Sequence, residues 1–171
     1  EGTTGDGQLM GLAVGGQMDP LPVAIMNFDF GSPDSFYASN LGITALVSQG
    51  IMINEQGRRF CSEGLPFQAR SNAITAQAHY GTKTFRVAST TQLGKNADAI
   101  LEKLQPYIEK DWAHEASSLD ELAKWMDVPA DTLKAEVAQF NTFVDNKKDE
   151  MFNRPMAKAT KVEGEKYYAI K

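Results

Sequence analysis

Cysteine and histidine are almost missing from this sequence. The 171 residues include one cysteine, Cys61, and two histidines, His79 and His114. A single cysteine excludes an internal disulfide and a zinc site built from thiolates, and neither histidine has ligand-like spacing to a partner. We therefore predict no metal site. Cys61 follows Phe60 in an apolar run, which predicts a buried and inert thiol.

Long apolar runs and basic runs are also lacking. No segment approaches the roughly 20 apolar residues that a helix needs to cross a bilayer, so we expect no membrane span. The net charge is -5, whereas a nucleic-acid surface is basic, so we expect no nucleic-acid partner. The longest basic cluster, Lys147-Lys148, runs into Asp149-Glu150, which indicates a solvated turn. No signal peptide opens the chain, and the sequence leaves the compartment undetermined.

Motifs of hydrolases and transferases are absent as well. The sequence has no nucleophile elbow and no phosphate-binding loop, and none of its acidic residues form a convincing catalytic pair. These absences argue against hydrolysis and group transfer.

The N-terminal segment is rich in glycine. Thr4-Gly5-Asp6-Gly7 precedes apolar residues at helical spacing, and Gly15-Gly16 follows them. The pattern predicts a short helix that Thr4 or Asp6 caps and that ends at a left-handed glycine. The first-turn amides and the positive end of the helix dipole suit an anionic or electron-rich group. The glycine spacing is not a dinucleotide-binding fingerprint, and no strand precedes it.

The remainder of the chain predicts an α+β domain. Short β-like runs alternate with amphipathic helices, and no internal repeat occurs. We expect a long ordered loop over 19–40, whose aromatic residues from Phe28 to Tyr37 pack it down or line a pocket, and then a hairpin over 51–61 that turns at Glu55-Gln56-Gly57. A helix from Pro66 to about Tyr80, a strand over 84–88 and a helix over 97–108 should follow. The last elements are a helix capped by Ser118, a helix beginning near Pro129 and a strand-like tail over 162–170.

Three segments together resemble one family of flavoproteins. They are Thr4-Gly5-Asp6-Gly7 with the helix behind it, the run I-N-E-Q-G-R-R-F-C-S-E over 53–63, and a series of short motifs, Ser118-Leu119-Asp120-Glu121-Leu122-Ala123, Phe140-Asn141, Phe152-Asn153-Arg154-Pro155 and Tyr167-Tyr168-Ala169-Ile170. Their order across nearly the whole chain is similar to the fumarate reductase/succinate dehydrogenase flavoprotein family, with its urocanate reductase and 3-ketosteroid dehydrogenase relatives.

This resemblance implies an internal piece of a larger FAD-dependent oxidoreductase, mainly its substrate-capping domain. Residues 1–22 then correspond to a remnant of the FAD-binding domain, residues 23–164 to the capping domain, and residues 165–171 to a strand that returns toward the FAD-binding domain. The implied partners are a small-molecule substrate and the rest of the parent chain. The piece alone is not expected to retain FAD. The residues that the resemblance places against FAD in the parent protein are Thr4, Gly5, Asp6 and Gly7.

The resemblance also indicates a substrate side, with a departure from the fumarate reductase pattern. Where those enzymes carry a proton-donating Arg, this chain has Phe67, and residues 43–47 lack the charges that support the donor. Ketosteroid-type relatives have Tyr at the position of Phe67. Arg70, about one helical turn further on, is the candidate catalytic residue, and Glu63 and Phe67 are the candidate substrate-side residues. The alternatives are a surface role for Arg70 and a structural pairing of Glu63 with Arg59.

We therefore predict a cap that closes over flavin and substrate, excludes water and takes part in reducing or dehydrogenating an activated C=C bond. The alternative is a self-contained, non-enzymatic module that binds a ligand or a partner without flavin.

Overall fold

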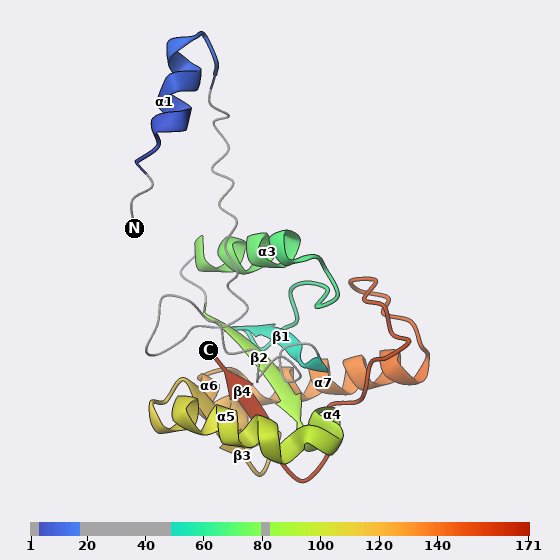
Figure 1. Ribbon diagram of the computed structural model, residues 1–171. Helices are drawn as coiled ribbons and strands as arrows, with labels where there is room; N and C mark the ends of the chain where they lie inside the picture. Colours follow the sequence, from blue (N-terminus) through green and yellow to red (C-terminus); the bar gives the residue numbers. More distant parts are fainter. Residues whose placement is uncertain (1–3, 18–48, 80–82) are drawn as a thin grey trace.

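The computed structural model describes residues 4–17, 49–79 and 83–171 of the chain (Figure 1). The predicted aromatic loop from Phe28 to Tyr37 lies outside these residues. Within them the chain forms helices and one small antiparallel sheet, which confirms the α+β class. None of the described helices is long and apolar enough to cross a membrane.

The sheet has four strands in the order β1-β2-β4-β3. They are β1 (Ile51–Asn54), β2 (Thr84–Ser89), β3 (Ala113–Ala116) and β4 (Tyr167–Ile170). All neighbours are antiparallel, and β4 pairs with β2 on one side and β3 on the other. The last strand in sequence therefore completes the middle of the sheet, where its apolar residues are buried on both faces.

Helices cover both faces of this sheet (Figure 1). The helices near the sheet are α3 (Phe67–His79), α4 (Thr90–Leu93), the 3-10 turn η2 (Gly94–Asn96), α5 (Ala97–Glu109), α6 (Leu119–Met126) and α7 (Ala130–Asp145). Helix α1 (Asp6–Ala13) lies apart from them (Figure 1). On one face Val87 and Ala169 join a core with Leu133 and Phe140 of α7. On the other face, Tyr168 joins a second core beneath α5. The alternation of strand residues between two cores follows from the two-residue period of a strand.

Several predicted elements are confirmed where the sequence pattern is strong. The helix over 97–108 is α5, and the strand over 84–88 is β2. Ser118 is the N-cap of α6, with its side chain accepting the amide of Glu121 at 3.2 Å. Pro129 directly precedes α7. Helix α1 ends as predicted, with Gly15 at φ 90° and the paired bonds of a Schellman motif.

The predicted N-cap residue of α1 was wrong. Neither Thr4 nor Asp6 caps the helix; the N-cap residue is Gly5, in the left-handed conformation at φ 80° with no side-chain hydrogen bond. The chain enters the helix through this glycine, whose carbonyl accepts the amide of Leu9. Asp6 lies inside the first turn, where its charge complements the helix dipole instead.

The predicted hairpin over 51–61 forms only in part. A single antiparallel bridge joins Ile53 to Arg59, and β1 takes β2 as its ladder partner. The amide of Arg59 donates to the Glu136 carboxylate at 3.4 Å, which draws the chain out of the ladder toward α7. The tail differs as well, because only Tyr167–Ile170 is strand, whereas the amide of Val162 donates to the Asn141 side chain.

Candidate functional site

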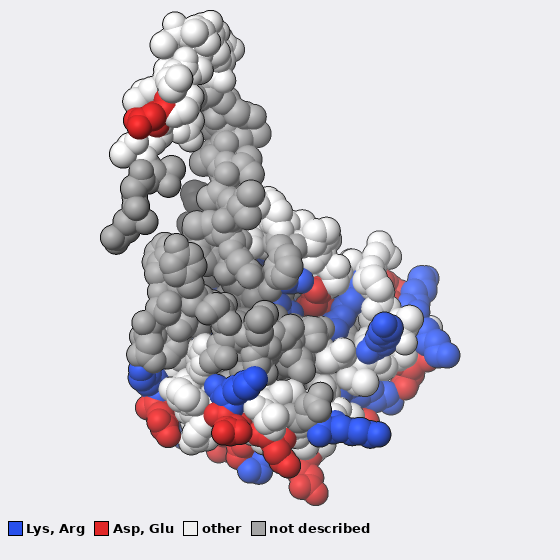
Figure 2. All heavy atoms as spheres, in the orientation of Figure 1, with Lys and Arg blue, Asp and Glu red and all other residues white. Residues whose placement is uncertain are grey.

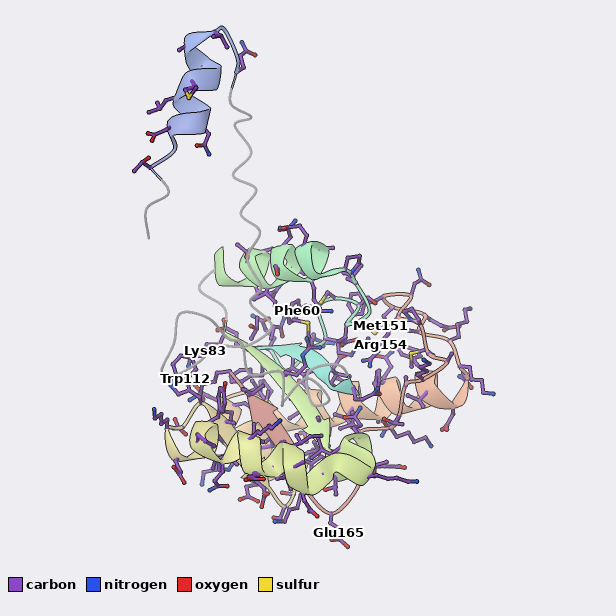
Figure 3. The ribbon with its side chains drawn as sticks, in the orientation of Figure 1. Phe60, Lys83, Trp112, Met151, Arg154 and Glu165 are labelled. Carbon is purple, nitrogen blue, oxygen red and sulfur yellow. The ribbon has the colours of Figure 1, made fainter. Side chains whose placement is uncertain are left out.

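Four charged side chains are buried together where β1, the segment 59–66 and the loop 149–155 meet. They are Arg59, Glu63, Asp149 and Arg154, which we call the buried charge cluster. Their side chains are between 0 and 5% exposed. Two guanidinium groups face two carboxylates, so the cluster is neutral overall. Figure 3 labels Arg154, which lies in the view between α3 and α7.

Glu63 is at the centre of the cluster. One of its oxygens accepts the Met52 amide at 2.9 Å and Arg59 Nε at 3.1 Å. The other oxygen accepts Arg59 Nη2 at 2.8 Å and Arg154 Nη1 at 3.1 Å. Four donors thus surround a carboxylate that is closed to solvent, and they fix its position relative to β1.

Asp149 organises the other side of the cluster. Its Oδ2 accepts Arg59 Nη2 at 2.9 Å and the Arg154 amide at 3.3 Å. Its Oδ1 accepts the amides of Met151 and Phe152 at 3.0 and 3.2 Å. One carboxylate therefore shapes the loop and ties it to Arg59. The solvated turn predicted here was wrong for Asp149, because its pairing with Arg59 lets it be buried.

Aromatic rings enclose the guanidinium groups. The Arg59 guanidinium carbon lies 5.0 Å from the ring centre of Phe140 and 5.3 Å from that of Phe152, and that of Arg154 lies 5.2 Å from Phe140. Arg59 Nη1 has no hydrogen-bond acceptor among the described residues. Cation–π attraction to these rings offsets part of the cost of burying the charge.

Burial and charge pairing act in opposite directions on the acids of the cluster. Burial alone would raise the pKa of Glu63, but hydrogen bonds and charges from Arg59 and Arg154 outweigh it, and the pKa lies below its usual value. The same balance lowers the pKa of Asp149. Both groups are therefore ionised at neutral pH. Burial, followed by the charge of Glu63, raises the pKa of the Cys61 thiol to about 11. Cys61 is 5% exposed, which confirms the predicted buried thiol.

Arg70 joins this region through the main chain. Its Nη1 donates to the carbonyl of Glu63 at 3.3 Å and to that of Leu65 at 3.0 Å. The side chain thus turns back from the first turn of α3 toward the segment that precedes the helix. No acidic residue occupies that first turn. A cation near a helix N-terminus opposes the helix dipole, so helix stability does not explain its placement.

The structure brings some of the predicted site residues together and not others. Glu63 lies in the cluster, Arg70 bonds its carbonyl, and Phe67 is the first residue of α3, between them in the chain. Figure 1 shows α1, with Thr4-Gly5-Asp6-Gly7 at its start, apart from the sheet and its helices. The described residues contain no group of three or more side chains able to hold a metal ion.

The start of α1 fits a role against an anionic cofactor. Among the described residues no side chain caps its N-terminal amides, and an added Cβ at Gly7 would meet nothing within 4 Å. Open backbone amides at a positive dipole end suit a phosphate or an electron-rich ring edge. The first-turn amides of α1 are therefore of the kind that an anionic group can bind.

A separate depression of about 440 Å³ lies at the end of the sheet near the last residue of the chain. Its lining consists of Lys83, Thr84, Phe85, Trp125, Met126, Asp127 and Lys171. It contains none of the predicted site residues.

Sequence reasoning missed the part that Asp149 and Arg154 play. Arg154 belongs to the motif Phe152-Asn153-Arg154-Pro155, which pointed to the family but to no role. Its partner Glu63 is 91 residues away in sequence, so only the fold shows the pair. The pairing of Arg59 with Glu63, four residues apart, was expected and is confirmed.

Comparison with known proteins supports the resemblance to the flavoprotein family. The chain is 32% identical over 120 residues to the fumarate reductase (cytochrome) of Shewanella frigidimarina, an alignment that covers 70% of this chain and 20% of that protein. It therefore spans about a fifth of that relative's length.

Solved structures share the fold. A 3-ketosteroid delta1-dehydrogenase from Sterolibacterium denitrificans matches 98% of this chain and 34% of its own, with a TM-score of 0.74 at 19% identity. The open conformation of a flavocytochrome c3 fumarate reductase matches 75% of this chain and 21% of its own, with a TM-score of 0.61 at 22% identity. The fumarate reductase flavoprotein subunit from Lactobacillus plantarum matches 90% of this chain and 93% of its own, with a TM-score of 0.59 at 20% identity.

The family model described as "FAD binding domain" matches residues 1–171, the whole chain. The chain therefore belongs to the FAD-binding family of fumarate reductase-like, FAD-dependent oxidoreductases.

Proposed function

We propose that this chain is mainly the substrate-capping part of a flavoprotein that reduces or dehydrogenates an activated C=C bond. The observation that carries the proposal is the placement of Arg70, held in the first turn of α3 by the carbonyls of Glu63 and Leu65. A guanidinium held by main-chain acceptors keeps one orientation, as a proton-transferring group requires.

The proposed domain boundaries are those that the family resemblance implies, and the exposed apolar residues of α1 support the first of them. Residues 23–164 would form the cap, and residues 1–22 would belong to the FAD-binding domain. Residues 165–171, whose strand β4 lies inside the sheet of the cap, would lead back toward the FAD-binding domain. Helix α1 has no buried residue, and it exposes 61% of Leu9, 70% of Met10 and 45% of Leu12. In Figure 2 its surface is almost wholly uncharged, whereas both signs are interspersed over the sheet and its helices. An apolar helix of this kind suits packing against another domain.

The roles of the remaining candidates follow from this arrangement. Thr4, Gly5, Asp6 and Gly7 would hold one edge of FAD through the first-turn amides of α1. When bound in the whole protein, FAD would supply the redox chemistry. Phe67, the first residue of α3, would be on the substrate side, and Arg70 would hold and deliver the proton from its guanidinium group. Glu63 lies on the same side of the cap, but its closed carboxylate leaves only its main chain to act.

A self-contained binding module is not favoured. The chain belongs to a family of FAD-dependent oxidoreductases and spans about a fifth of its Shewanella relative. A piece of a larger enzyme accounts for both facts, and for the exposed apolar residues of α1.

Turnover by the full-length, FAD-loaded flavoprotein tests the proposal. The protein would be given a chemically reduced dye as electron donor and a panel of unsaturated acids and ketones. We expect oxidation of the dye that depends on a compound with an activated C=C bond, and a loss of about 100-fold or more in kcat for Arg70→Ala with unchanged FAD content. Absence of turnover with every compound, in both the reducing and the dehydrogenating direction, would overturn the proposed function.

A further inference from the structure

We infer that Glu63 is a positioning residue for Arg70, and that it acts through its own main chain while its carboxylate serves as an internal anchor. This inference rests on the proposed function, because it concerns the group to which that function assigns the proton. It assigns to the buried charge cluster a part in the reaction although none of its side chains is open to substrate.

The first step is the closure of the Glu63 side chain. It is 0% exposed, and its two oxygens accept four hydrogen bonds, two of them from Arg59. A group in this state has no access to a substrate or a cofactor. Any effect of Glu63 on chemistry must therefore pass through the part of the chain that it holds in place.

The second step is the short turn that links Glu63 to α3. The Leu65 amide donates to the Ser62 carbonyl at 3.2 Å, which closes the turn. Gly64 packs so tightly on Pro155 that an added Cβ would lie 2.8 Å from its Cδ. Pro155 directly follows Arg154, whose guanidinium bonds the Glu63 carboxylate. The turn is therefore held in two places, at the Glu63 carboxylate and at the contact of Gly64 with Pro155.

The third step is the acceptor pair that this turn presents. The carbonyls of Glu63 and Leu65, the residues on either side of Gly64, both accept a hydrogen bond from Nη1 of Arg70, at 3.3 and 3.0 Å. If the anchor shifts, both acceptors shift with it, and the guanidinium group follows. A displacement of about 1 Å at a reacting group costs on the order of 100-fold in rate.

The buried charge cluster holds the fold together whether or not it positions Arg70, so the test must separate these two effects. The full-length, FAD-loaded protein would be compared with Glu63→Gln, Arg70→Ala and the double variant. The matched control is Glu136→Gln, since Glu136 is also buried and bonds Arg58 and the Arg59 amide, which precede the turn at residues 62–65.

Positioning predicts a specific pattern in the kinetics. Glu63→Gln should lower kcat at least about tenfold with little change in KM and in FAD content, and Glu136→Gln should not. With Ala at position 70, Glu63→Gln should cause no further loss, because the group that it positions is gone. Losses that multiply in the double variant would overturn the inference, as would normal kcat in Glu63→Gln.

If Glu63→Gln fails to fold, a second variant and a second measurement still test the inference. Gly64→Ala leaves all four charges in place and moves the turn against Pro155, and it should reproduce the loss in kcat. Amide hydrogen exchange over residues 62–70 should be faster in Glu63→Gln or Gly64→Ala than in Glu136→Gln. Unchanged exchange would overturn the inference without any assay of turnover. Absence of wild-type turnover would instead remove the proposed function, and the exchange result would still decide whether Glu63 fixes the turn.

Discussion

Glu63→Gln is expected to cost this chain about 3–5 kcal/mol in the free energy of unfolding. Each carboxylate oxygen of wild-type Glu63 accepts two hydrogen bonds. In Glu63→Gln the amide nitrogen would replace one of these oxygens, and it cannot accept a hydrogen bond from the two N–H groups that point at it. The substitution also leaves two buried guanidinium groups with one carboxylate, Asp149. Removing one partner from a buried ion pair costs about this much, because the remaining charge is not compensated. The loss would be a large share of the roughly 5–15 kcal/mol that stabilises a domain.

Urea unfolding at pH 7, followed by circular dichroism, measures this loss. The control is Glu136→Gln, in which the hydrogen bonds affected are 3.3 and 3.4 Å long and one partner, Arg58, has a side chain that is 65% exposed. We expect the control to lose about 1 kcal/mol. Equal losses in the two variants, or a loss below about 1 kcal/mol for Glu63→Gln, would show that the cluster does not anchor the fold as described.

Four other predictions concern the pH dependence of stability, the backbone at Gly57, the reactivity of Cys61 and the inner strand of the sheet. Because the pKa values of Glu63 and Asp149 are lowered in the folded chain, their stabilisation is complete above the unfolded value near pH 4 and is lost as the pH falls through the folded values; urea unfolding from pH 7 to 3 should show this decline, reduced in Glu63→Gln. Gly57→Ala should cost about 1–2 kcal/mol by the same assay, because φ is +77° and the added Cβ would lie 3.3 Å from the backbone of α7. Cys61 should react with a thiol reagent at pH 8 at least about 100-fold more slowly in the folded than in the urea-unfolded chain, and equal rates would contradict its burial. Deleting residues 167–171 should abolish cooperative unfolding, because β4 is an inner strand, and a retained transition would contradict the sheet order.

The sequence predicted best those elements whose signals are local. Helices α5, α6 and α7 carry apolar stripes of helical period, and the Ser118 cap lies within its own turn, so neighbouring residues suffice to specify them. Strand β3, with the sequence Ala-His-Glu-Ala, was not predicted because it has little β preference of its own. It forms because β4 offers it an open edge and α5 and α6 pack against it.

The same distinction applies to the candidate site. The pairing of Arg59 with Glu63 was one of the alternatives for these two residues of the 53–63 motif, and the structure contains it. The contributions of Asp149 and Arg154 were not, because charged residues are normally exposed and only partners about 90 residues away explain their burial. The contact of Arg70 with two carbonyls depends on the turn geometry at Gly64, which no local pattern in the sequence specifies.

The alkaline limb of the pH profile tests most directly whether Arg70 delivers the proton in a reaction at a C=C bond. Wild type and Arg70→Lys would be compared in the full-length, FAD-loaded protein, with kcat measured from pH 7 to 11. The guanidinium of Arg keeps its proton well beyond the pH at which the ammonium of Lys loses it, near 10.4. Our account predicts that the Lys variant keeps part of the activity at pH 7 and loses it as the pH approaches 11, whereas the wild type shows no such loss from this group over the same range. Superimposable alkaline limbs in the two proteins, at any level of activity, would contradict it.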